Sequence, residues 1–248
     1  MDISPADALL LAAGLVGGAV NAMAGGAKLF VFPMLLAAGM PPVAANITGT
    51  VALWPAVAPA IWVYRDRIRR DWRALLLGAA PALAGAGLGA LGLMLSDDAT
   101  FMAMVPSILA LALTAILFGD PLAAWGRRSG FASRWGVTAL LLVSGLYGGF
   151  FGAGLGFLLM AAFTLAGADD PQDANARKVL YATLINTTAV IPLSFTGLVD
   201  WRAAALVAVG GLLGGYGGAH LTRLLPRRPM RWAVALLGAG LTLSFILR

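Results

Sequence analysis

The sequence predicts an all-α polytopic membrane protein, made of two homologous repeats that are inverted relative to each other. Three observations predict it: a hydrophobic composition, long apolar stretches and an internal repeat. Of the 248 residues, 60% are hydrophobic and 11% are charged, whereas soluble domains carry about 25% charged residues. Apolar runs of about 20 residues recur from end to end, as spanning helices require. A spanning β-barrel would show short segments of alternating polarity instead.

The internal repeat covers both halves of the chain. The glycine pattern of residues 14–18 returns at residues 145–149, a shift of 131. Ala45-Asn46 returns as Ala174-Asn175, and the stretch 71–74 returns unchanged at 200–203, both at a shift of 129. A single two-residue deletion reconciles these shifts. We therefore expect a first membrane repeat over 1–118, a cytoplasmic linker over 119–135 and a second membrane repeat over 136–248.

Each repeat is expected to hold about three full spans and one pair of segments broken by glycine. Two segments look short for a bilayer that needs about 20 helical residues. Glycines join each of them to its predecessor, at Gly25-Gly26 and at Gly152-Ala153-Gly154. Each pair could be a re-entrant hairpin, one bent span or two thin spans. The hydrophobic segments are 8–24, 29–38, 46–64, 74–95, 101–118, 136–152, 154–166, 175–195, 203–225 and 230–247.

The distribution of basic residues favours inverted halves. Short cytoplasmic loops collect Lys and Arg. If the broken segments are hairpins, the loops 65–73, 119–135, 167–178 and 223–231 lie inside with fourteen basic residues, against two outside. If each broken segment counts as one span, the split is ten against six. Hairpins and paired thin spans fit the first split equally well. We expect a cytoplasmic-membrane protein with 65–73, 119–135 and 223–231 inside.

Several functional classes are unsupported by the sequence. The N-terminus is acidic and resembles no signal peptide, there is no cysteine, and one histidine, His220, leaves little room for a metal site. The net charge of +6 is explained by arginine-rich cytoplasmic loops rather than by nucleic acid. No phosphate-binding loop of the G-x-x-x-x-G-K-[ST] type is present. We expect no cofactor and no metal; a homo-oligomer is compatible with the sequence.

Motifs in both halves resemble the TauE/SafE family of membrane anion exporters and permeases. The first half carries Asn21-Ala22-Met23-Ala24-Gly25-Gly26, then Pro41-Pro42 and Ala45-Asn46-Ile47-Thr48. The second carries the glycines of 148–156 and Ala174-Asn175-Ala176-Arg177-Lys178. The likeness covers nearly the whole chain. It implies a transporter of small anions, often sulfite or organosulfonates. Lys28 departs from it, since relatives usually carry a small or hydroxyl residue there.

The glycine breaks supply the first candidate site residues. An anion that crosses a membrane must exchange its hydration for fixed dipoles, and helix N-termini offer unpaired N–H groups and partial positive charge. Glycine lets the backbone approach a ligand closely. Gly25, Gly26, Gly154 and Gly156 are therefore expected to give main-chain contacts to the anion, although glycines can equally serve turns or helix contacts.

Polar side chains beside these breaks complete the predicted substrate site. Lys28 lies within a membrane segment, where a charge costs roughly 2.5–3.5 kcal/mol and usually marks a pathway or a paired site; the alternative is snorkelling to water. Asn46 and Asn175 open helices, either as N-caps or as amide donors to the anion, and the two roles are compatible. The predicted set is Asn21, Gly25, Gly26, Lys28, Asn46, Thr48, Gly154, Gly156, Asn175 and Lys178.

Secondary transport of a small anion is the function that this pattern favours. An intramembrane enzyme is disfavoured, because Asp97-Asp98 and Asp169-Asp170 lack a further spaced ligand and are expected to be polar caps. A passive anion channel stays open. The polar trio 186–188 either faces a cavity or bonds between helices, and the structural role is favoured. The glycine-rich stretches 85–89 and 210–218 are expected to serve helix packing. Substrate, coupling ion and direction of flow do not follow from the sequence.

Overall fold

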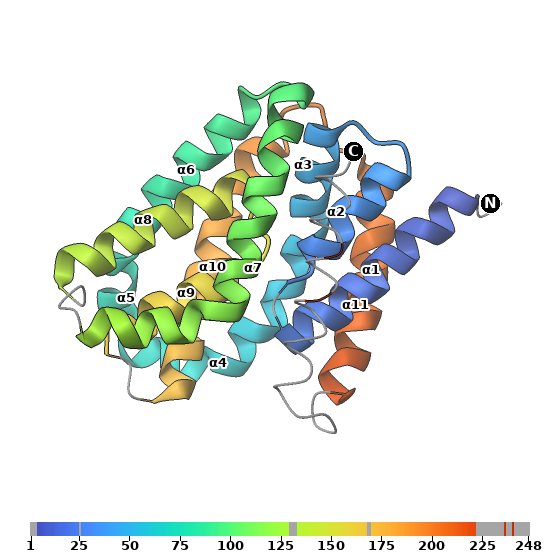
Figure 1. Ribbon diagram of the computed structural model, residues 1–248. Coiled ribbons are helices and arrows are strands. Elements are labelled where there is room, and N and C mark those ends of the chain that lie inside the picture. Colours follow the sequence, from blue (N-terminus) through green and yellow to red (C-terminus); the bar gives the residue numbers. More distant parts are fainter. Residues whose placement is uncertain are drawn as a thin grey trace.

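The computed structural model describes residues 4–24, 26–128, 133–167, 170–221, 236 and 240. Within this part of the chain the fold is all-helical, with no strand. Figure 1 shows the helices side by side in one bundle. They are α1 (Pro5–Ala24), α2 (Lys28–Ala37), α3 (Pro42–Leu53), the 3₁₀ helix η1 (Trp54–Val57), α4 (Ala58–Arg70), α5 (Trp72–Gly78), α6 (Ala80–Met94), α7 (Asp98–Arg128), α8 (Arg134–Phe150), α9 (Leu155–Leu165), α10 (Pro171–Leu193) and α11 (Trp201–Leu221).

Prolines move several helix boundaries away from the expected ones. Helices α3 and α10 begin at Pro42 and Pro171, because proline has a preset φ and lacks the N–H that a first helical residue leaves unpaired. The expected span 46–64 is broken at η1, with Pro55 inside η1 and Pro59 in the first turn of α4. Residues expected as loops are helical: 65–70 end α4, and 119–128 belong to α7.

The two short segments beside the glycine breaks form short helices, α2 of 10 residues and α9 of 11. By length and apolar composition, one described stretch, Asp98–Gly119, could cross a membrane alone. Two bent pairs could each add a span: Pro42–Val57 with Ala60–Arg70, bent by 65°, and Trp72–Gly78 with Ala80–Met94, bent by 45°.

Glycines bring the first helix of each repeat against a later helix of the other repeat, α11 for α1 and α6 for α8. In α1, a Cβ added at Gly14 would lie 2.2 Å from the Val207 carbonyl oxygen of α11. In α8, a Cβ added at Gly145 would lie 2.0 Å from the Ala82 carbonyl oxygen of α6. Only glycine permits such backbone contact. The α1–α11 and α8–α6 pairs are therefore the closest-packed parts of the bundle, as the glycine-rich stretches 85–89 and 210–218 predict.

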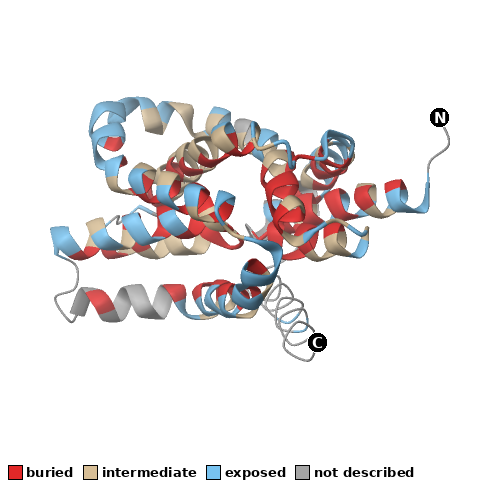
Figure 2. Ribbon diagram, turned by 90° about the horizontal axis from the view of Figure 1, so that it is seen from above, coloured by how far each residue is buried: buried red, intermediate tan, exposed pale blue. Residues whose placement is uncertain are grey.

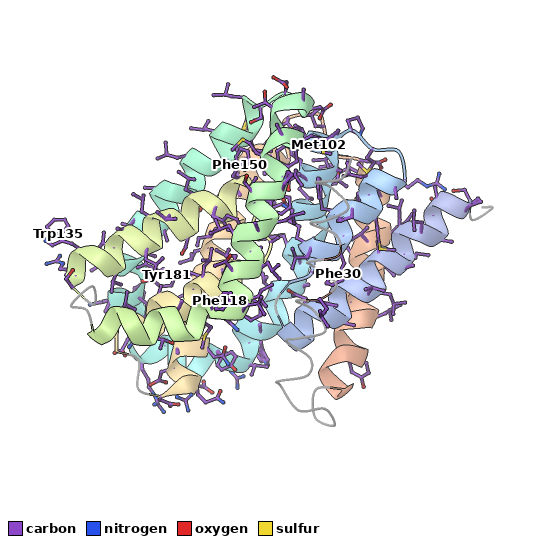
Figure 3. All side chains as sticks on the ribbon, viewed as in Figure 1. Phe30, Met102, Phe118, Trp135, Phe150 and Tyr181 are labelled. Carbon is purple, nitrogen blue, oxygen red and sulfur yellow. The ribbon has the colours of Figure 1, made fainter. Side chains whose placement is uncertain are left out.

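The interior is apolar and aromatic, and so is much of the exterior. Figure 2 shows buried residues on the helix faces that meet, with exposed residues on the outer faces. Phe32 of α2 packs edge-on against Phe101 of α7, with ring centroids 5.8 Å apart. Large apolar side chains remain exposed, including Leu77, Phe195 and Trp135, and Trp135 points outward at the start of α8 (Figure 3). An apolar outer surface suits a lipid environment.

Two pairs of corresponding helices run in opposite senses in the view of Figure 1, while the inverted arrangement of the repeats stays a prediction. In Figure 1, α1 descends from the N-terminal end whereas α8 rises, and the same reversal relates α6 to α11. Helices α2 and α9 each turn back beside the helix that precedes them. The predicted loop 223–231, His220's side chain, Asp169 and Gly25 lie outside the described residues or side chains. The domain boundaries at 118 and 135 stay predictions.

Candidate functional site

Two adjoining cavities lie where the glycine breaks of the two halves meet. The smaller is about 80 Å³ and the larger about 200 Å³. They share four lining residues and therefore adjoin, and the two together are called the recess below. Asn21, Val57, Gly152 and Asn186 line both. The smaller cavity is also lined by Ala27, Lys28, Thr50, Leu53, Phe151 and Gly154; the larger by Ala56, Ala60, Leu155, Gly156, Lys178, Val179 and Ala182.

Lys28 places an ammonium group at the wall of the smaller cavity. It is the first residue of α2, and 6% of it is exposed. Its Nζ donates a hydrogen bond to Thr50 Oγ1 on α3. The Thr50 hydroxyl donates in turn to the Asn46 carbonyl, at 2.8 Å. Among the described residues Lys28 has no ion-pair partner. Snorkelling to water, the alternative suggested by the sequence, is not seen.

An aromatic ring covers one side of this ammonium group. The Nζ of Lys28 lies 5.4 Å from the centroid of the Phe151 ring, in the turn between α8 and α9. Phe151 is fixed in turn by Phe32, whose ring packs edge-on at 5.3 Å. A cation over an aromatic face gains modest electrostatic attraction. The ring does not neutralise the charge, so the cavity remains electropositive.

The second half contributes the start of α9. Gly154 precedes the helix in the left-handed region, at φ +72°, a conformation that side chains strain to adopt. Gly156 lies in the first turn, where N–H groups have no intrahelical acceptor. Lys178 of α10 lies alongside: its Cδ would be 3.7 Å from a Cβ added at Gly156. The starts of α2 and α9 thus face one recess, and each is accompanied by a lysine.

Asn21 and Asn186 carry amide side chains, and each of them lines both cavities. Asn186 donates from Nδ2 to the Ala182 carbonyl, at 2.8 Å, the i−4 bond of a polar residue inside a helix. Sequence reasoning assigned Asn186 to helix packing and did not consider Thr50. Both stand in helices that are apolar on most sides, so hydrophobic periodicity gave no sign of which residues face a cavity.

Four of the predicted site residues do not line these two cavities. Asn46 lies four residues inside α3 and donates from Nδ2 to the Phe150 carbonyl at 2.8 Å, which ties the two halves. Thr48 accepts from the Asp200 N–H at 3.1 Å. Asn175 lies inside α10, and Gly26 accepts from the Leu29 N–H; neither lines either of these two cavities. The N-cap role expected of Asn46 and Asn175 is wrong, because the prolines start both helices earlier.

Asp97, Asp170 and Asp173 lie at helix ends, where they cap or pair. Asp97 accepts from the Thr100 N–H at 2.8 Å, and Asp170 from the Gln172 N–H at 2.8 Å, as the expected polar caps. The Gln172 N–H and then the Arg67 guanidinium hold the pKa of Asp170 below its usual range. Arg67 of α4 also bonds Asp173, so this cluster joins the two halves. In the described part of the chain no cluster of three His, Cys, Asp or Glu side chains could hold a metal.

A second ion pair joins the halves at another end of the bundle. Arg202 Nη2 lies 2.7 Å from Asp7 Oδ2, which ties the starts of α11 and α1. The buried Oδ1 of Asn46 and Oγ of Ser144 have no hydrogen-bond partner among the described residues. Neither residue lines the recess. The recess is therefore the place in the described chain where cationic and amide side chains converge on open space.

Comparisons with known proteins identify the family of the chain. The family model described as "Sulfite exporter TauE/SafE" matches residues 10–245. A "Probable membrane transporter protein" of Haemophilus influenzae is 28% identical over 247 residues, covering 96% of this chain and 94% of that protein. Similarly named proteins of Xylella fastidiosa and of a Sinorhizobium species are each 27% identical and cover 79% of their own lengths.

No solved structure matches the chain. The relatives' names indicate a transporter rather than an enzyme. The matched region includes both glycine breaks and both lysines, so the likeness extends over the whole recess. The chain is a membrane transporter and belongs to the sulfite exporter TauE/SafE family.

Proposed function

We propose that this protein is a secondary transporter of a small anion, with the sulfur oxyanions and organosulfonates as the first candidates. The anion binds in the recess between the starts of α2 and α9. Lys28 gives the main charge contact, Gly154 and Gly156 give backbone contacts, and Asn21, Asn186 and Lys178 complete the lining. The protein lies in the cytoplasmic membrane, with 65–73, 119–135 and 223–231 inside.

One observation supports an anionic substrate above all others. Lys28 is a buried ammonium group that opens onto a cavity and has no acidic partner among the described residues. Burying a charge in the membrane is costly, and such residues usually mark a substrate or ion pathway. An anion in the cavity would supply the missing opposite charge. The family description, a sulfite exporter, names a solute of the required charge.

The helix starts add to the same electrostatic field. The N-terminus of a helix carries partial positive charge and N–H donors, which suits anion binding. Ala27 at the start of α2 and Gly154 at the start of α9 both line the smaller cavity. Broken helices from two repeats that meet at one site are typical of transporters with inverted repeats. The opposite senses of α1 and α8 support that arrangement here (Figure 1).

Binding measurements on Lys28 variants test the proposal. A hydrogen bond to a charged group is worth about 1.5–3 kcal/mol, so Lys28→Met should weaken anion binding roughly 10- to 100-fold. Lys178→Met should weaken it less, because Lys178 is half-buried. Arg69→Met removes an equal charge from an exposed position and serves as the control. The readout is isothermal titration of purified protein with sulfite, thiosulfate and sulfoacetate.

Two results would contradict the proposal. Wild-type protein that binds none of these anions would remove the sulfur oxyanions as substrates. Unchanged affinity in Lys28→Met, together with a wild-type elution profile in detergent, would remove Lys28 from the site. A channel rather than a carrier would show flux that does not saturate with anion concentration.

The topology is tested separately by single cysteines, since the chain has none of its own. Cysteines at positions 68, 130 and 229 should react with an impermeant maleimide only from the cytoplasmic face. The reasoning is the positive-inside rule applied to inverted halves. Labelling of position 229 from outside the cell, with position 68 still inside, would show parallel halves instead.

A further inference from the structure

The charge of Lys28 has a consequence for the transport cycle, which follows from where the acidic residues are. The chain contains eleven acidic residues, all of them aspartate. They stand at positions 2, 7, 66, 71, 97, 98, 120, 169, 170, 173 and 200. None lies in the stretches 8–65, 72–96, 121–168 or 174–199, which include both glycine breaks and every lining residue of the recess. Among the residues that the structure describes, no carboxylate pairs with this buried ammonium group.

The contacts of Lys28 satisfy its hydrogen bonding without cancelling its charge. The Thr50 hydroxyl is a neutral acceptor, and it is held in place by its own bond to the Asn46 carbonyl. The Phe151 ring is neutral as well. The other charged side chain that lines the recess, Lys178, is also cationic. Among the described residues no acidic group neutralises the charge of Lys28, so we assign this task to a mobile anion.

Alternating access requires the recess to close on both sides between its two open states. Closing expels water, and an unpaired charge without water is strongly disfavoured. A bound anion removes most of this penalty, because the closed recess then holds a pair. An empty recess keeps the whole penalty. The protein with a bound anion should therefore switch its recess from one side of the membrane to the other far faster than the empty protein does.

We propose that this transporter is an obligatory anion exchanger, in which Lys28 prevents the empty recess from closing. The inference rests on the proposed function and adds its mode: an anion leaves only when another anion enters from the opposite side. The counter-substrate must itself be a small anion, because it has to pair with the same ammonium group. The fixed charge thus replaces a co-transported cation as the means of coupling.

Efflux from proteoliposomes tests the exchange mode. Vesicles are loaded with ³⁵S-sulfite or, in parallel, ³⁵S-thiosulfate, under nitrogen, and valinomycin with equal potassium on both sides holds the membrane potential at zero. We expect efflux at least about 10-fold faster into buffer with the same unlabelled anion than into buffer with an impermeant anion, a ratio equal to about 1.4 kcal/mol of barrier. Arg69→Met should show the same ratio.

Lys28→Met identifies the residue responsible. Without the fixed charge the empty recess can close, so the ratio of exchange to net efflux should fall toward one, even if both rates decline. Lys28→Arg keeps the charge and should keep the ratio. If Lys28→Met does not insert or fold, the ratio of exchange to net efflux in the wild-type protein still tests obligatory exchange.

The outcomes are separable. Wild-type efflux that is equally fast with and without an external permeant anion would overturn obligatory exchange and leave the proposed function standing. Net efflux accompanied by proton movement, seen with a trapped pH dye, would overturn it too, because Lys28 would then release its proton and cross empty. No flux of either anion under any condition would overturn the proposed function, and exchange with it.

Discussion

The two halves share their glycine breaks and their glycine contacts between helices, but they differ in the side chains that face the recess. Lys28 corresponds to Phe157 at the 129-residue shift and to Leu159 at the 131-residue shift, apolar in either case. Thr50, which holds Lys28, corresponds to Val179. The first half thus carries a lysine–threonine pair where the second half carries apolar residues.

The reverse holds for the polar residues of the second half. Lys178 corresponds to Gly49, and Asn186 corresponds to Val57. Val57 and Asn186 nevertheless line the same two cavities. Each half therefore supplies a polar group where the other supplies a small or apolar one. Because both halves converge on one recess, strict symmetry would double each group there, and a second buried ammonium beside the first would be repelled.

We expect the largest effect from substitutions of the helix-contact glycines that both halves share, and we expect it to be equal in the two halves. Gly14→Val and Gly145→Val each place a Cβ about 2 Å from a carbonyl oxygen of the partner helix, which forces backbone to move. Both should abolish the monodisperse protein in detergent. Gly87→Ala, where a Cβ meets nothing within 4 Å, is the matched control. A well-folded Gly145→Val protein would show that α6 and α8 do not pack as closely as described.

The lysine–threonine pair occurs in the first half alone, so we expect a loss of anion affinity only from a substitution in that half. Thr50→Val removes the hydroxyl that accepts from Lys28 while keeping the side-chain shape, so anion affinity should fall about 2- to 10-fold, as expected for one lost hydrogen bond. Val179→Thr, at the corresponding position of the second half, should change affinity by less than about twofold. Titration with sulfite measures both. Equal losses in the two variants would show that Thr50 has no special relation to Lys28.

The contact between the halves at Arg67 should give the smallest effect. Arg67 bonds Asp170 and Asp173 at the surface, and surface ion pairs contribute little. The pKa of Asp170 is lowered in the folded state, mainly by the Gln172 N–H. Its stabilisation is therefore full above the ordinary carboxyl pKa and is lost as pH falls through the lowered value. Asp170→Asn should reduce the unfolding temperature slightly at neutral pH, by differential scanning fluorimetry, and not in strong acid.

The sequence predicts the helical fold better than it predicts the side chains that line the recess. Lys28, Gly154 and Lys178 could be predicted from the sequence, because a charge or a repeated glycine is unusual in an apolar stretch. Asn46 and Thr48 carry the same polar signal yet bond Phe150 and Asp200 instead. In a helix that is apolar on most sides, the hydrophobic pattern does not show which face points toward a cavity. Sequence alone therefore could not separate residues that line the recess from residues that bond other helices.

Helix boundaries were the other source of error, and their cause is local. The apolar run 46–64 contains Pro55 and Pro59, which interrupt the helical hydrogen bonds and divide the run into α3, η1 and α4. Hydropathy ignores that interruption. The same break places Val57 at both cavities. Pro55 and Pro59 therefore mark a position at the recess that composition alone does not indicate.

The pairing of α1 with α11 sets an order for biosynthesis. Gly14 finds its partner backbone only when residue 207 has left the ribosome, whereas Gly145 meets α6, which is made before it. At roughly 5–20 residues per second, α1 waits about 10–40 seconds in the bilayer without its partner. Its glycine face is open to lipid or to other nascent helices during that time. Quality control of this transporter should therefore depend on the completion of its last helices rather than its first.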